Sequence, residues 1–205
     1  MWTAGPPLAT ARQQFAFAAV GTALYVRRRV AAHGAALASV EVLETSSGGG
    51  WSAGPPLVKA RTFCGLAPIG RMLYAVGGYD GSNYTTSVEV LNTESGGAWA
   101  AGPPLAAERS WLGLSALGNT LYAVGGYNSS AYLASVEVLD TYGGEGLVEG
   151  PPLSIGRCAF GPANVGAMLY AAGGNDGSGR HPQDPILTSV EVLKGPEAEK
   201  QVAAV

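Results

Sequence analysis

The hydrophobic positions of this chain fall into short runs that are bounded by glycine. Residues 63–69, 111–117 and 73–76 form such apolar runs, whereas each Ser-Val-Glu-Val segment alternates polar and apolar residues. Short apolar runs between turn residues and a period of two both favour β-strands. Because no segment shows a capped helical pattern longer than two turns, the sequence predicts an all-β fold.

The predicted strands recur in a long internal repeat. The segment Trp-x-Ala-Gly-Pro-Pro-Leu begins at Trp2, Trp51 and Trp99, and a copy with Leu in place of Trp begins at Leu147. These positions are 49, 48 and 48 residues apart, and Ser-Val-Glu-Val-Leu occurs once in every unit. We therefore expect four repeats, at about 2–50, 51–98, 99–146 and 147–194. A C-terminal tail follows at 195–205.

Each repeat is expected to contain four antiparallel strands, termed A to D. Strand A follows a recurring arginine, strand B contains Leu-Tyr, strand C is Ser-Val-Glu-Val-Leu, and strand D lies at the tryptophan. Gly70-Arg71 and Gly118-Asn119 fit tight turns between A and B, because glycine readily adopts a positive φ. A four-stranded unit repeating about every 48 residues is typical of a β-propeller blade.

Composition excludes several other classes. The chain has 205 residues, 47% of them hydrophobic, which is enough for a core and too apolar for a disordered chain. With 12 Lys and Arg against 15 Asp and Glu, it lacks the basic excess of a nucleic-acid-binding surface. The apolar run at 15–26 is too short to span a membrane. The two cysteines, at different positions in repeats two apart, do not suggest a disulfide, which favours a cytoplasmic location.

The repeats resemble kelch repeats. The resemblance depends on the double glycine after strand B, the tyrosine within that strand and the tryptophan downstream. The double glycines are Gly77, Gly78, Gly125, Gly126, Gly173 and Gly174, with Tyr74, Tyr122, Tyr170, Trp51 and Trp99 beside them. It implies a propeller of about four kelch-type, four-stranded blades. The first repeat departs from the pattern, because Arg28-Arg29 stands where the other repeats have the double glycine.

The strand order raises the question of ring closure. The sequence opens on a D strand and the last repeat contains no D segment of its own. Pairing of residues 1–4 with 189–193 would close a ring and protect both edges. The alternatives are an incomplete propeller or an arc that needs a partner chain.

One arginine and one glutamate also recur in every repeat. They are Arg12, Arg61, Arg109 and Arg157, with Glu41, Glu89, Glu137 and Glu191. We expect a buried ion pair within or between blades, which would fix geometry more than it stabilises the fold. The alternative is a ring of cations that lines one face.

No catalytic, metal or cofactor site is predicted. His33 and His181 lack the spacing of metal ligands, and the chain has neither a nucleophile elbow nor a phosphate loop. Some kelch-like propellers are enzymes of carbohydrate or oxidative chemistry, and that class is the alternative function.

A binding face is expected where the D–A and B–C connections meet, on one side of the blades. Aromatic side chains dominate binding hot spots, and this face gathers several. The candidates are Gln14, Phe63, Tyr79, Asp80, Ser110, Trp111, Tyr127, Asn128, Asn175 and Asp176. Kelch substrate receptors bind short peptides on the equivalent face, so the resemblance implies a protein-interaction module such as a substrate-recognition adaptor. The residues after the repeat arginines are uncharged, so a strongly acidic partner is not expected; the alternative places Phe63 and Trp111 in the packing between blades.

Overall fold

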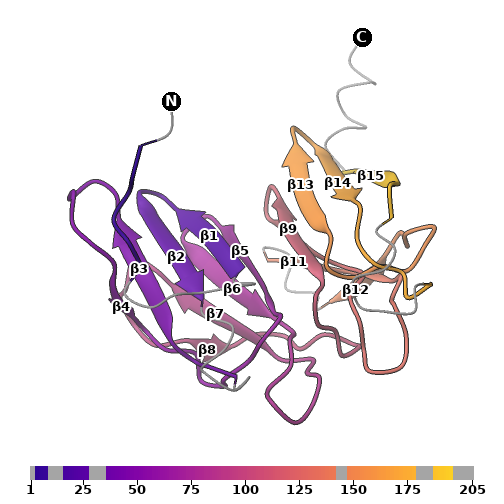
Figure 1. Cartoon of the computed structure of the whole chain (residues 1–205), viewed down its shortest axis with the longest axis horizontal. Coiled ribbons are helices and arrows are strands. Elements are labelled where there is room, and N and C mark those ends of the chain that lie inside the picture. The colour runs from indigo at the N-terminus through magenta and orange to yellow at the C-terminus, as the bar shows by residue number, and fades with distance from the viewer. Residues whose placement is uncertain (1–2, 9–15, 28–35, 142–146, 179–186, 196–205) are drawn as a thin grey trace.

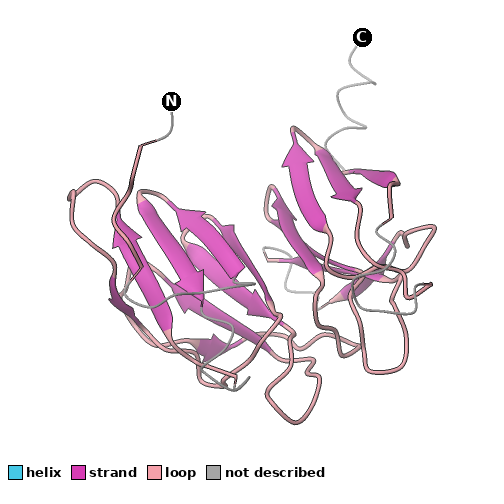
Figure 2. Cartoon of the chain, viewed as in Figure 1, coloured by secondary structure: helices cyan, strands magenta, loops and turns pink. Residues whose placement is uncertain are grey.

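The chain folds as a four-bladed β-propeller. The computed structural model describes residues 3–8, 16–27, 36–141, 147–178 and 187–195, and these contain strands and no helix. The strands form four antiparallel sheets, three with four strands and one with three (Figure 1, Figure 2). The predicted all-β fold and its blade architecture are confirmed.

The strands follow one another in chain order within each blade. Blade 1 contains β1 (Ala16–Val20), β2 (Ala23–Arg27), β3 (Val40–Glu44) and β4 (Ser52–Gly54). Blade 2 contains β5 (Gly65–Ile69), β6 (Met72–Val76), β7 (Val88–Asn92) and β8 (Ala100–Ala101). Blade 3 contains β9 (Gly113–Leu117), β10 (Thr120–Val124), β11 (Val136–Asp140) and β12 (Val148–Gly150). Blade 4 contains β13 (Gly161–Val165), β14 (Met168–Ala172) and β15 (Val190–Lys194).

The tight turns between the first two strands of each blade are as predicted, but the first strands begin later than predicted. Gly70 and Gly118 have φ values of 56° and 57° and connect the hairpins. Strands β5 and β9 begin at Gly65 and Gly113, so Phe63 and Trp111 lie outside them. The apolar runs thus include residues of the preceding connection as well as the strand.

The core lies between successive blades. Strand β1 packs on β5, β5 on β9, and β9 on β13. At the first interface, Leu57 of blade 1 and Leu73 and Trp99 of blade 2 belong to one buried cluster. Because each blade has two apolar faces, an internal blade is covered on both sides by its neighbours.

The two ends of this series of blades are not joined by any described segment. No comparable packing connects β13 to β1 among the described residues, and the described N-terminal residues Thr3 and Ala4 form no strand with β15. The predicted closure by residues 1–4 is therefore wrong for Thr3 and Ala4, while Met1 and Trp2 lie outside the described residues. As far as the structure describes the chain, the four blades therefore form an open arc.

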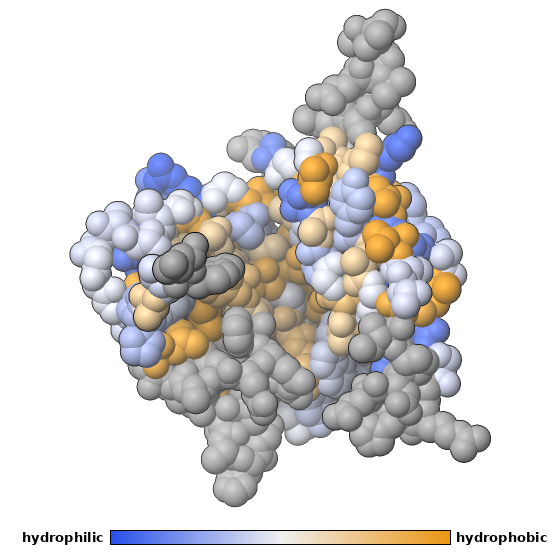
Figure 3. Space-filling view, turned by 45° about the horizontal axis from the view of Figure 1, so that its top comes forward, coloured by the Kyte–Doolittle hydropathy of each residue, from blue (hydrophilic) through white to orange (hydrophobic). Residues whose placement is uncertain are grey.

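The open end of blade 4 exposes an apolar sheet face. Val165, Val190 and Val192 are 68%, 56% and 50% exposed, whereas the repeat equivalents of Val190 in blades 2 and 3, Val88 and Val136, are at most 3% exposed. The space-filling view shows a hollow between the first two and last two blades, and hydrophobic residues on the surface around blade 4 (Figure 3).

Candidate functional site

The D–A and B–C connections lie side by side in each of blades 2 to 4, as expected from the strand order. Thr62 and Tyr79 exchange backbone hydrogen bonds of 2.6 and 2.8 Å, and Ser110 and Tyr127 exchange bonds of 2.9 and 2.8 Å. Cys158 pairs with Asn175 in the same way. We call the side of the propeller formed by these connections the loop face.

The repeat arginines hold the connections of the loop face in place through hydrogen bonds inside each blade. Arg109 is fully buried, and its Nη1 donates to the carbonyl oxygens of Gly125 and Ser135 at 2.8 and 3.1 Å. Its Nη2 donates to the hydroxyl of Ser135 at 3.1 Å and to Glu137 at 2.6 Å. One side chain therefore fixes strand B, strand C and the carboxylate of blade 3.

The same arrangement occurs in the neighbouring blades and confirms the predicted ion pairs. Arg61 and Arg157 each donate to their glutamate, Glu89 or Glu191, at 2.5 Å. The glutamates also accept backbone N–H groups that precede the arginine, such as that of Val58 at 2.7 Å. Since the three arginines are at most 1% exposed, the alternative of a cationic ring is wrong for them, and Arg12 lies outside the described residues.

The double glycines interlock adjacent blades. Gly78 N–H donates to the carbonyl of Arg109 at 2.9 Å, so blade 2 is bonded to blade 3 through the repeat arginine's backbone. Gly77 has a φ of 64°, and a Cβ there would lie 2.3 Å from the same carbonyl oxygen. A side chain would therefore break the interface. Gly125, Gly126, Gly173 and Gly174 also have positive φ values.

Six aromatic rings form a continuous cluster on the loop face. The ring centroids of Phe63 and Trp111 are 3.7 Å apart, and those of Trp111 and Tyr127 are 6.4 Å apart. Tyr84 lies 5.6 Å from Tyr127. Tyr79 packs 5.2 Å from Tyr84, and Tyr132 packs 5.2 Å from Tyr127. This aromatic cluster joins the connections of blades 2 and 3, and all six residues are half-buried.

The backbone of Phe63 and Trp111 is in the left-handed region. Phe63 and Trp111 have φ values of 55° and 50°, which are uncommon for bulky residues. Hydrogen bonds across the blades hold them there, because Trp111 N–H donates to Phe63 C=O, and Ala159 N–H donates to Trp111 C=O, both at 2.9 Å. Such conformations cost on the order of 1–3 kcal/mol each and gather at functional sites.

The predicted polar site residues mainly shape the loops. Asp80 Oδ1 accepts the N–H groups of Ser82 and Asn83 at 2.8 and 2.7 Å, and these bonds lower the pKa of its carboxyl. Asn128, Asn175 and Asp176 accept N–H groups in the same type of turn. Asp176, whose pKa is lowered by the hydrogen bonds from Ser178, is thus charged at neutral pH.

One predicted contact residue is buried, and another falls outside the described part of the chain. Ser110 is fully buried and its hydroxyl donates to the carbonyl of Tyr127 at 3.2 Å, so it supports the loop from below. Gln14 lies outside the described residues.

Sequence reasoning missed Tyr84 and Tyr132. The signal was present, because each follows the tyrosine after a double glycine by five residues and the pair recurs 48 residues later.

The cysteines and charged residues suggest no reactive centre in the described part of the chain. Neither Cys64 nor Cys158 forms a disulfide, and burial raises the pKa of the Cys158 thiol to about 11. Within the described ranges, no group of three or more His, Cys, Asp and Glu could hold a metal ion. His33 and His181 are outside those ranges. No helix among the described residues is long and apolar enough to cross a membrane.

The interlocked, repeated blades define this chain as a repeat-built β-propeller. A family model described as the Kelch motif matches residues 60–106 and 112–145, which include blade 2, strands β9 to β11 of blade 3 and every ring of the aromatic cluster except Trp111. The chain therefore carries Kelch repeats, as the residues predicted. A comparison with curated proteins finds no match. Kelch propellers commonly mediate protein–protein interaction and are mostly non-catalytic.

Proposed function

We propose that the chain is a non-catalytic protein-interaction module, such as a substrate-recognition adaptor, and that it binds a protein or peptide segment on the loop face. The observation that carries this proposal is the aromatic cluster. Half-buried rings on a rigid support offer a large contact area at little cost in side-chain entropy, which is the chemistry of binding hot spots.

The charges around the cluster favour an apolar or neutral segment. The three described repeat arginines are buried in ion pairs, so they offer no cation to an acidic ligand. The carboxylates of Asp80 and Asp176 have lowered pKa values and are negatively charged at neutral pH. A strongly acidic segment would be repelled by them.

The test begins with a displayed library of random linear peptides, from which binders of the wild-type chain are selected. The affinity of a selected peptide is then measured for the double variant Trp111→Ala, Tyr127→Ala. Loss of two central rings should weaken binding at least tenfold, in line with about 1.4 kcal/mol or more for a hot-spot pair. The selected peptides should also lack an excess of acidic residues.

Two further variants separate binding from folding. Arg71→Ala, Glu94→Ala removes an exposed ion pair from the A–B and C–D turns, at the opposite ends of the strands, and should leave affinity unchanged. Trp111→Gly removes the ring while relieving the left-handed backbone, so a stable fold is expected. Wild-type affinity in a folded Trp111→Gly or double variant would refute the proposal.

A further inference from the structure

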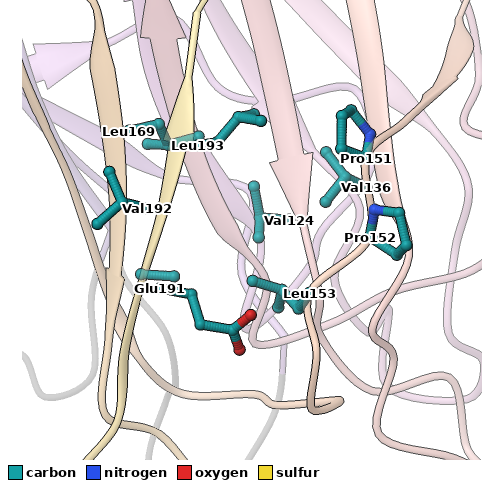
Figure 4. A pocket seen from close by; sticks show the side chains of 10 residues that line it. Val124, Val136, Pro151, Pro152, Leu153, Leu169, Glu191, Val192 and Leu193 are labelled. Atoms are coloured by element: carbon teal, nitrogen blue, oxygen red, sulfur yellow. The ribbon is translucent and has the colours of Figure 1, made fainter.

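A pocket lies between blades 3 and 4 (Figure 4). It is lined by Pro151 and Leu153 on one side, by Leu169 of β14, and by Glu191 and Leu193 of β15. The lining is apolar apart from the glutamate, which its arginine neutralises.

The equivalent position between blades 1 and 2 is occupied by a tryptophan. Trp99, 3% exposed, belongs to the same buried cluster as Leu57, Leu73 and Leu91, which are the repeat equivalents of Leu153, Leu169 and Leu193. Its Nε1 donates to the carbonyl of Pro55 at 2.9 Å, and Pro151 is the repeat equivalent of Pro55. The pocket therefore has the lining and the acceptor of a tryptophan site.

Strand β15 beside this pocket also has the form of a strand that takes a partner. In blades 1 and 3, the corresponding strands β3 and β11 pair with a D strand, and Gly54 and Gly150 lie opposite Val40 and Val136. A Cβ on Gly54 would lie 2.6 Å from Val42 Cγ2, so this position requires glycine.

Gly5 has the same repeat position, yet a Cβ on it would meet nothing within 4 Å. Among the described residues, nothing therefore requires glycine at this position.

The N-terminal segment is held on blade 1 in the way a D strand is held on the following blade. Trp51 Nε1 donates to the carbonyl of Pro6 at 3.1 Å, just as Trp99 donates to Pro55. Among the described residues, blades 1 and 4 of one chain are not packed together, and this segment does not pair with its own β15. A second copy can supply it with every described contact preserved.

We propose that residues 2–8 of a second copy pair with the free edge that β15 shows among the described strands, as its D strand, and that Trp2 of that copy enters the pocket. The register of blade 1 places Thr3 opposite Val192 and Gly5 opposite Val190. Blade 1 of the second copy then stacks on blade 4 of the first. It covers the exposed valines of blade 4 and its own Phe17, which is 49% exposed where its equivalents Leu66 and Leu114 are buried.

This contact is head-to-tail, so it generates either a closed ring or a growing series of arcs. Two different surfaces take part, which makes the contact testable with two different variants in one mixture.

The test uses the full chain. Thr3→Cys and Val192→Cys chains, carrying tags of different size, are mixed and oxidised, since facing residues of antiparallel strands lie within disulfide reach. We expect a covalent species of about twice the 20.7 kDa chain mass that contains both tags. Each variant alone should give none of this species. Light scattering of the wild-type chain should show a mass above that of the monomer that rises with concentration.

Three substitutions test the contact without the crosslink. Trp2→Ala and Val192→Lys should each weaken self-association at least tenfold, whereas Val58→Lys, at an exposed valine outside the contact (70%), should not. A wild-type monomer at all concentrations, or a crosslink that forms only within a single Thr3→Cys, Val192→Cys chain, would overturn the proposal. The second result would instead mean closure of one chain on itself.

Discussion

Replacing Arg109 with alanine removes the anchor of blade 3 and is expected to destabilise the fold strongly. The arginine is fully buried and makes four hydrogen bonds, two to backbone carbonyls, one to Ser135 and one to Glu137. Alanine leaves Glu137, whose side chain is only 7% exposed, without its counter-charge. The two remaining N–H donors, from Ala106 and Ala107, do not replace a full positive charge.

The size of the effect follows from this loss. Removing one partner of a buried ion pair costs about 3–5 kcal/mol, much of it the penalty of the unpaired charge that stays behind. In a chain of this size, each kcal/mol of lost unfolding free energy lowers the thermal midpoint by about 2–4 °C. The thermal midpoint of Arg109→Ala should therefore fall by roughly 6–20 °C.

The assay is urea unfolding followed by tryptophan fluorescence, with calorimetry as a second probe. Arg157→Ala should cost less, because Glu191 is 21% exposed and can recover some hydration. Arg71→Ala, which breaks an ion pair whose side chains are 67% and 62% exposed, should cost less than about 1 kcal/mol. A cost below about 1 kcal/mol for Arg109→Ala would refute the anchoring role.

Three further outcomes can be measured on the same chain. In urea unfolding, Gly118→Ala should cost roughly 1 kcal/mol and Gly125→Ala at least twice as much. Both glycines have a φ of 57°, but only a Cβ on Gly125 would lie 2.6 Å from the carbonyl oxygen of Arg157. Equal costs would contradict the role of the double glycine in the contact between blades. The Cys158 thiol, with a pKa of about 11, should resist thiol reagents at pH 8 until the chain unfolds; rapid labelling of the native chain would contradict its burial. Burial raises the pKa of Glu191, but the hydrogen bonds from Ser154 and the charge of Arg157 lower it by more. The resulting pKa is therefore below its usual 4.5. The stability it adds is present above pH 4.5 and is lost as the pH falls through the lowered value. The deficit of a Glu191→Gln variant relative to wild type should therefore shrink as the pH falls below 4.5, and a deficit that grows over that range would contradict this.

The repeat makes the blades and their anchors predictable from sequence. Arg61, Arg109 and Arg157 occupy the same surroundings because the residues they bond recur at the same spacing. A contact repeated in register leaves the same mark in every unit, so its partners can be paired from their spacing alone. The double glycines are predictable for the same reason.

The aromatic cluster is only partly predictable. Apolarity places Phe63 and Trp111 at the start of a strand, but hydrogen bonds between blades hold both in a left-handed conformation before the strand begins. Neighbouring blades thus override the local strand preference. The sequence predicts Ser110 as a contact residue, but it is buried. Its burial depends on Tyr127, which lies in the B–C connection and exchanges backbone hydrogen bonds with it, and this contact cannot be seen in the local sequence.

The exposure of a sheet face depends on its neighbour more than on its own sequence. Blade 4 carries the same Val-Glu-Val-Leu strand as blades 1 to 3, and its first valine is 56% exposed where Val136 is 2% exposed. The sequence therefore predicts that this segment is a strand, but it does not predict whether the faces of the strand are buried. Gly5 presents the converse case. It is a glycine at a repeat position where close contact with a neighbouring C strand demands one, and the described part of its own chain provides no such contact. Its identity makes physical sense when a strand like β15 lies against it, and the exposed β15 of another copy supplies that surface.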